Sequence, residues 1–121
     1  MRLGLDIHGV IDANPIFFSQ LTKDLIAAGW EIHIITGSPR KKIEKDLCSW
    51  NIYYTHIFSI TDYQESQGTL IEYDDKGDPW MDSETWDKTK GWYCAKENIS
   101  LHLDDMLKYK KYFCTPFALY T

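Results

Sequence analysis

The stretch from Leu3 to Asp12 constrains the fold of this chain more than any other. Its apolar residues lead to Asp6, which is followed by His8 and Gly9. Such a run predicts a buried strand, and a polar residue at its carboxyl end predicts a site at the edge of an open parallel sheet. We therefore expect the other functional side chains to gather around Asp6.

Three later apolar runs, over residues 32–35, 55–58 and 100–103, also end in polar residues. These endings are Thr36-Gly37, Ser59 and Asp104-Asp105. The carboxyl ends of parallel strands share one edge of the sheet, so these side chains should lie near Asp6. Polar groups gathered there indicate a site, because a core would leave them without partners.

The chain has 121 residues, of which 44% are hydrophobic and 26% charged. This length and composition predict one globular domain over residues 1–121, with a modest core. The net charge is −5, from 13 basic and 18 acidic side chains, and no segment collects basic residues. Nucleic acid is therefore not expected as a partner.

Three cysteines, Cys48, Cys94 and Cys114, are an odd number without CxxC spacing. This pattern argues against a disulfide framework and a zinc site, and we expect reduced, partly buried thiols. The first residues do not show a charged segment followed by a long apolar stretch, and no apolar run reaches about 18 residues, so we expect neither secretion nor membrane spanning. We expect a cytoplasmic protein that makes no membrane contact and is a monomer or a weak homodimer.

The order of the predicted elements indicates an α/β fold. Asn14-Pro15 predicts a helix start and Gly29 its end, and Ser38-Pro39 predicts the start of a second helix between strands at 31–36 and 53–59. Alternation of this kind predicts a three-layer, Rossmann-like parallel sheet of about five strands. The remaining predicted elements are a helix over 83–98, a strand ending at Asp104-Asp105, helical turns over 106–112 and a final strand over 116–120.

Residues 61–89 interrupt this alternation. Within them, 69–73 and 79–81 flank the turn sequence Asp74-Asp75-Lys76-Gly77-Asp78, which predicts a short hairpin. The hairpin is a candidate flap over the site, with Trp80 or Trp86 at its base. A packed excursion without ligand contact is an equal alternative.

The acidic strand ends, with a lysine between them in sequence, describe a site for a hard cation and an anionic substrate. Carboxylate oxygens select Mg²⁺ over zinc or copper, and Mg²⁺ readily binds phosphate oxygens. The sequence therefore predicts Mg²⁺ as a cofactor and a small phosphorylated substrate.

The same residues resemble the motifs of the haloacid dehalogenase (HAD) superfamily, the aspartate-nucleophile phosphatases. Asp6-Ile7-His8-Gly9-Val10 is similar to the first motif, and Ile34-Ile35-Thr36-Gly37-Ser38 to the second. A lysine and then Leu101-His102-Leu103-Asp104-Asp105 follow in the family's order. The ordered set spans most of the chain and resembles small, nearly capless members.

The resemblance implies a role for each matching residue. Asp6 would be the nucleophile, and Mg²⁺ would be held by Asp6, the His8 carbonyl and Asp104, with Asp105 tuning its water shell. Thr36, with Gly37 and Ser38, would bind the phosphoryl oxygens, and a lysine would balance their charge. Lys90 is preferred to Lys88 for that role, because it falls at the start of the helix that precedes the acidic pair.

His8 departs from the family pattern, in which this position is usually a second aspartate that acts as acid and base. An imidazole can in principle do both, so the first hypothesis is a phosphatase that acts on a small phosphomonoester, with a nucleotide as one option. The alternative is a weak or inactive binding or regulatory module. The other histidines, His33, His56 and His102, lie in apolar runs and are expected to be satisfied core residues.

Overall fold

The computed structural model describes residues 1–121 and contains a five-stranded parallel sheet in the order β3-β2-β1-β6-β7. Every neighbouring pair in this sheet is parallel. The strands are β1 (Arg2–Leu5), β2 (Glu31–Thr36), β3 (His56–Ser59), β6 (Leu101–Asp104) and β7 (Phe117–Leu119). The predicted α/β, Rossmann-like fold is confirmed.

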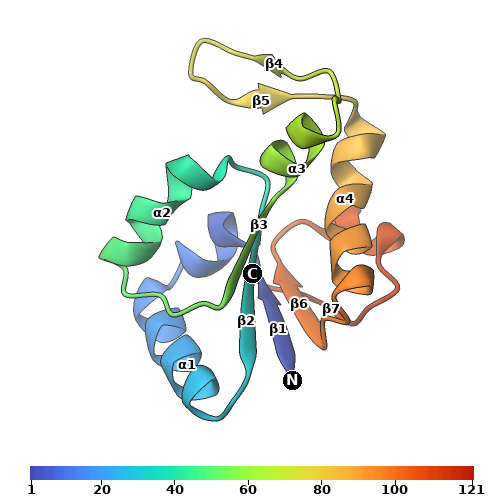
Figure 1. Cartoon of the computed structure of the whole chain (residues 1–121). Helices are drawn as coiled ribbons and strands as arrows, with labels where there is room; N and C mark the ends of the chain where they lie inside the picture. Colours follow the sequence, from blue (N-terminus) through green and yellow to red (C-terminus); the bar gives the residue numbers. More distant parts are fainter.

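Helices cover both faces of this sheet (Figure 1). In that view α1 and α2 lie on one side of the strands, and α4 and η2 lie on the other. The helices are α1 (Pro15–Ala27), α2 (Arg40–Ser49), α3 (Ile60–Ser66), α4 (Ser83–Lys96), the single turn η1 (Ile7–Ile11) and the 3₁₀ helix η2 (Leu107–Tyr112). The result is a three-layer arrangement, with the parallel sheet between two layers of helices.

The local signals at the first helix act as the sequence predicts. The Asn14 side chain accepts a hydrogen bond from the Phe17 amide, and Pro15 occupies the first helical position. Gly29, just beyond the helix, has φ +89°. The second helix begins at Arg40 rather than at Ser38, because Pro39 adopts an extended backbone before it.

The core is divided between the two faces of the sheet. One cluster packs Phe18, Ile43 and Leu47 of the helices against strand residues such as Leu5 and Ile34. The other packs Tyr93 and Cys94 of α4 against Ile35 and Phe58. Each cluster contains a residue near the carboxyl end of β2, Ile34 in the first and Ile35 in the second, so that end is held by buried side chains on both faces.

Residues 61–89 contain the predicted hairpin, formed by β4 (Glu72–Tyr73) and β5 (Pro79–Trp80). Figure 1 places it at the end of the molecule opposite the N-terminus. Asp74 organises its turn by accepting hydrogen bonds from the amides of Lys76 and Asp78 and from the indole of Trp80. The range also contains most of α3 and the first half of α4, so the hairpin is shorter than the range predicted for it.

Other sequence predictions need correction. The third strand begins at His56 rather than near residue 53, and Ser59 caps α3 by accepting a hydrogen bond from the Asp62 amide. His33 and His102 are buried as predicted, but His56 is exposed because it lies at the start of the edge strand β3. Of the three free thiols, only Cys94 is buried.

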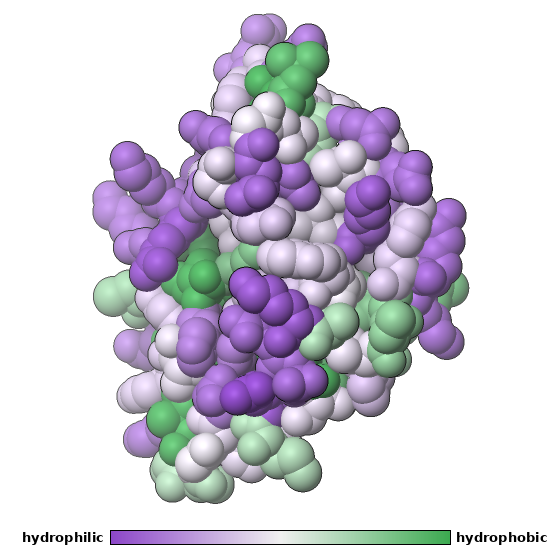
Figure 2. All heavy atoms as spheres, turned by 45° about the vertical axis from the view of Figure 1, so that its right-hand side comes forward, coloured by the Kyte–Doolittle hydropathy of each residue, from purple (hydrophilic) through white to green (hydrophobic).

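On the face drawn in Figure 2, strongly hydrophobic residues form small areas separated by hydrophilic and intermediate ones. None of the helices combines the length and the apolar character needed to cross a bilayer.

Candidate functional site

Three carboxyl groups meet at the carboxyl edge of the sheet. Asp6 follows β1 directly, Asp104 ends the neighbouring strand β6, and Asp105 comes next in the chain. The Asp6 amide donates to the Leu103 carbonyl at 3.1 Å and so continues the pairing of the two strands. One oxygen from each carboxyl group lies within 4.8 Å of the others, as the sequence predicts for Asp6 and the acidic pair.

Lys90 lies between two of these carboxylates. Its Nζ is 3.0 Å from Asp6 Oδ1 and 2.8 Å from Asp104 Oδ2, and its side chain is 3% exposed. The ammonium also lies over the ring of Tyr109, 4.9 Å from the centroid. Of the two candidate lysines, Lys90 is thus the one that α4 places beside Asp6 and Asp104. We call the part of the carboxyl edge formed by Asp6, Asp104 and Asp105 the acidic edge.

Burial controls the protonation of this cluster. Burial raises the pKa of Asp6 from 3.8 to about 7, although the Lys90 ammonium opposes the change. Burial alone would also raise the pKa of Asp104, but hydrogen bonds from His102 and Lys90 outweigh it and lower that pKa. Burial would likewise lower the pKa of Lys90, but Asp6 and Asp104 raise it. These shifts favour an ionised Lys90–Asp104 pair, and they make Asp6 the carboxyl group that holds its proton most strongly.

The acidic edge could hold a metal ion. Its donors are oxygens, which suit Mg²⁺ or Ca²⁺. The turn after β1 comes close to Asp105, since a Cβ on Gly9 would lie 2.1 Å from Asp105 Oδ2, and Gly9 has φ +80°. Only glycine fits a position that combines this close approach with this backbone conformation. The residues present therefore fit a divalent cation held by carboxylates.

His8 lies on the turn above Asp6 and faces the second strand end. Its Nε2 is 3.3 Å from Ser38 Oγ, and its Nδ1 is 3.4 Å from Asp12 Oδ2. Asp12 is itself held by the Gly9 amide, which donates to Oδ1 at 2.8 Å. Asp12 was not predicted as a site residue, although its position four residues after His8 on a tight turn is a usable signal.

The end of β2 supplies Thr36, Gly37 and Ser38. The buried Thr36 hydroxyl accepts a hydrogen bond from the Ser38 amide at 3.2 Å. Gly37 is covered by an indole ring, since a Cβ there would lie 2.3 Å from Trp86 Cζ2. The Trp86 indole donates to the Tyr109 hydroxyl at 3.0 Å. Trp86 and Tyr109 therefore form an aromatic wall between Gly37 and Lys90, and Tyr109 has no distinguishing signal in the sequence.

A cavity of about 250 Å³ lies on the outer side of this wall, at the base of the hairpin. It is lined by Trp80, Met81, Trp86, Lys108 and neighbouring residues. Trp80 and Trp86, the residues predicted for the base of the flap, thus line this cavity. It is large enough for a small organic group attached to a ligand at the acidic edge.

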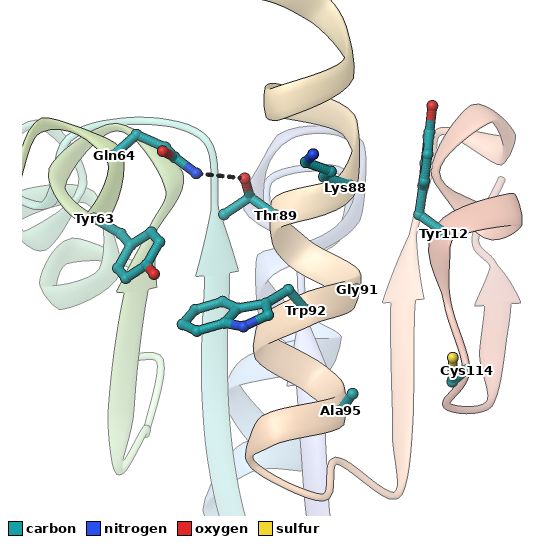
Figure 3. Close-up of a pocket in the computed structure, with 9 residues that line it drawn as sticks. All are labelled: Tyr63, Gln64, Lys88, Thr89, Gly91, Trp92, Ala95, Tyr112 and Cys114. Atoms are coloured by element: carbon teal, nitrogen blue, oxygen red, sulfur yellow. Dashed lines mark hydrogen bonds between the residues drawn. The ribbon is translucent and has the colours of Figure 1, made fainter. Parts of the chain in front are cut away.

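A larger cavity, of about 410 Å³, runs along α4 away from the acids (Figure 3). Tyr63 and Gln64 lie on one side of the helix, and Tyr112 and Cys114 on the other. Lys88 lines this cavity. Lys88 and Lys90, two residues apart on α4, therefore point to different surroundings.

The sequence-predicted residues form two groups at one edge. Asp6, Lys90, Asp104 and Asp105 contact or neighbour one another directly, whereas Thr36 and His8 are linked through Ser38. Comparisons of the chain with models of protein families, with curated proteins and with solved structures found no match.

Proposed function

We propose that this protein is a Mg²⁺-dependent phosphatase that uses Asp6 as its nucleophile on a small phosphomonoester. The observation that carries the proposal is the meeting of Asp6, Asp104 and Asp105 around the buried Lys90 ammonium. Three of these charged groups, Asp6, Lys90 and Asp104, are buried at a cost in free energy, and such clusters are typical of functional sites. The order of the motifs, which resembles the HAD superfamily, supports the same reaction.

In the proposed reaction, an Asp6 oxygen attacks phosphorus as the bond from phosphorus to the leaving oxygen breaks. The leaving oxygen takes a proton from the His8 imidazolium and departs as an alcohol. Water, which gives a proton back to His8, then attacks phosphorus and releases inorganic phosphate and the Asp6 carboxylate. Asp12 holds His8 Nδ1 and so directs Nε2 toward the end of β2.

The other residues of the edge bind the transferring group. The Thr36 hydroxyl hydrogen is free to donate to a phosphoryl oxygen, because its oxygen already accepts from Ser38. The Gly37 amide and the Ser38 hydroxyl border the same position, and Lys90 supplies positive charge. Mg²⁺ bound to Asp6, the His8 carbonyl and Asp104 would polarise the phosphoryl group and offset its negative charge, with Asp105 orienting the water around the ion.

The substrate class follows from the aromatic wall. Trp86 and Trp80 border the hollow of about 250 Å³, and the Trp86 ring also covers Gly37 of the proposed phosphoryl site. A flat leaving group would stack there, which favours aryl phosphates or nucleotides among small phosphomonoesters.

The test is phosphate release from an aryl phosphate and from a panel of nucleoside monophosphates, with and without Mg²⁺. We expect release only with the metal, and we expect Asp6→Asn to lower kcat by at least about 10³-fold. Lys88→Ala is the matched control, because Lys88 lies on the same helix outside the site, and it should keep the wild-type rate. Full activity in Asp6→Asn would disprove the nucleophile.

A second candidate is a phosphate-binding module without turnover. The observation that favours it is His8, an imidazole where the resembled enzymes usually have a carboxylate, with only long contacts of 3.3 and 3.4 Å to its neighbours. Calorimetry with orthovanadate and Mg²⁺ distinguishes the two. Binding without hydrolysis by the wild type, together with hydrolysis by His8→Asp, would establish this candidate instead.

A further inference from the structure

The amino-terminal edge of the sheet carries a second cluster of metal-ligating side chains. Glu31 and His33 lie two residues apart on β2 and so project from the same face, and His56 of β3 is the register partner of His33. One ligand atom from each residue lies within 4.8 Å of the others. Because β2 spans six residues, this cluster lies on the order of 15 Å from the acidic edge.

The spacing of the three groups fits one small ion. Glu31 Oε1 is 2.9 Å from His33 Nε2 and 3.8 Å from His56 Nδ1. Ligands about 2.1 Å from a tetrahedral ion lie about 3.4 Å from each other, between those two distances. The imidazole rings are stacked with centroids 4.1 Å apart, so His56 must turn its ring to aim a nitrogen at the same point. Its 46% exposed side chain is free to do so.

His33 already has the support that metal-bound histidines require. Its side chain is 2% exposed, and its Nδ1 lies 2.7 Å from the Tyr93 hydroxyl on α4. With the proton on Nδ1, the Tyr93 oxygen accepts it, and Nε2 presents its lone pair toward Glu31. A hydrogen bond of this kind from the second ring nitrogen fixes the orientation of a histidine ligand.

Thr55 and Arg2, which contact His56 and Glu31, each have another hydrogen-bond acceptor, so both metal-ligating side chains can turn to an ion. The Thr55 hydroxyl lies 2.8 Å from His56 Nδ1, but it can donate to the Ile32 carbonyl at 3.0 Å instead. Arg2 is 3.2 Å from Glu31 Oε1, and it also donates to the Glu97 carbonyl, which would keep it in place if Glu31 turned to a metal.

We propose that Glu31, His33 and His56 bind a divalent transition-metal ion of the zinc class, with water completing the coordination. Two imidazoles and one carboxylate select Zn²⁺, Co²⁺ or Ni²⁺ over Mg²⁺, whereas the all-oxygen acidic edge has the opposite preference. The site is independent of the proposed phosphatase activity, because it shares no residue with the acidic edge.

The experiment titrates chelator-treated protein with Zn²⁺ against a chromophoric chelator, with excess Mg²⁺ present to occupy the acidic edge. We expect one equivalent of bound Zn²⁺, and Co²⁺ in its place should give visible absorption bands. His56→Ala and Glu31→Gln should each weaken Zn²⁺ binding at least about 10-fold, and Tyr93→Phe should weaken it about 10-fold without removing a ligand. Both ligand variants alter exposed side chains, so the fold should persist, which circular dichroism verifies.

Two controls separate this site from adventitious binding. The double variant Cys48→Ser with Cys114→Ser removes the exposed thiols, and His8→Ala removes the exposed histidine of the other edge. Both should bind Zn²⁺ as the wild type does. Absence of Zn²⁺ binding, wild-type affinity in His56→Ala and Glu31→Gln, or its loss in a control would overturn the proposal.

Discussion

The two edges of the sheet hold cations against carboxylates at nearly the same distance but in opposite surroundings. At the carboxyl edge, Lys90 lies 3.0 and 2.8 Å from Asp6 and Asp104, with side chains 3%, 9% and 0% exposed. At the amino edge, Arg2 lies 3.2 Å from Glu31, with side chains 40% and 38% exposed. The distances do not distinguish these contacts, so any difference in their energies must come from burial.

The difference in burial decides whether the cation at each edge can leave its carboxylate. Water screens the Arg2–Glu31 pair, so either partner can leave it at little cost. Lys90 cannot leave its carboxylates without exposing unpaired charges to a dry interior. The acidic edge is therefore rigid and preorganised around a charge, whereas the amino edge can exchange one cation for another.

Removing the Lys90 ammonium should have the largest effect. Lys90→Met leaves Asp6 and Asp104 buried without their counter-ion, and the loss of one partner of a buried pair costs about 3–5 kcal/mol. We expect the free energy of unfolding to fall by that amount in metal-free urea titrations. Lys88→Met, two residues away on the exposed side of α4, should change it by less than about 0.5 kcal/mol. Equal effects of the two substitutions would remove the contrast between the edges.

Neutralising Asp6 should stabilise the protein, the reverse of the Lys90 result. The charge of Asp104 alone balances Lys90, so Asp6 adds a second, uncompensated negative charge. Asp6→Asn should raise the free energy of unfolding by about 1–3 kcal/mol at about pH 8 in metal-free buffer.

The pH dependence of this gain has a definite sign. The pKa of Asp6 in the folded state, about 7, lies above its ordinary value of 3.8, so the folded state binds more protons between these two values. The wild type therefore loses stability as pH rises through this window, and Asp6→Asn does not. Urea unfolding at about pH 5 and about pH 8 should give a larger advantage to the variant at the higher pH. A stability advantage of Asp6→Asn that became smaller as pH rose would contradict the raised pKa of Asp6.

Removing the Tyr93 hydroxyl tests the buried hydrogen bond that this residue makes to His33 at the amino edge. Tyr93→Phe leaves the buried His33 Nδ1 without its partner, and an unsatisfied buried polar group costs about 1–3 kcal/mol. Thermal and urea unfolding should both detect the loss. Tyr112→Phe is the control, because Tyr112 is half-buried and Figure 3 draws no hydrogen bond to its hydroxyl, and it should change stability by less than about 0.5 kcal/mol.

The acidic edge was predictable from sequence because parallel strands bring their carboxyl ends together whatever their register. An apolar run followed by a carboxylate is enough to place Asp6 beside Asp104, and this prediction is confirmed. The choice of Lys90 rested only on its position in the chain. The structure adds the contacts, because the rotation of α4 about its own axis decides which lysine faces inward.

The amino edge could not be predicted in the same way. Its cluster depends on the pairing of His33 with His56, and register between strands is set by packing that a single sequence does not specify. His56 was assigned to the core because it lies in an apolar run, yet β3 is an edge strand and leaves it exposed. The short helix α3 was missed for a related reason: Ile60–Ser66 carries too few turns for an apolar period to appear.

The Arg2–Glu31 contact should give the smallest effect. Arg2→Ala removes an exposed ion pair, so we expect a loss of only about 0.2–1 kcal/mol, and less at high ionic strength. Urea titrations at low and high salt measure both quantities, and Lys23→Ala, on an exposed face without an ion pair, is the reference. A loss comparable to that of Lys90→Met would mean that the amino edge is as rigid as the acidic one. Glu31 would then be fixed by Arg2, and the exchange of this cation for a metal ion would be blocked.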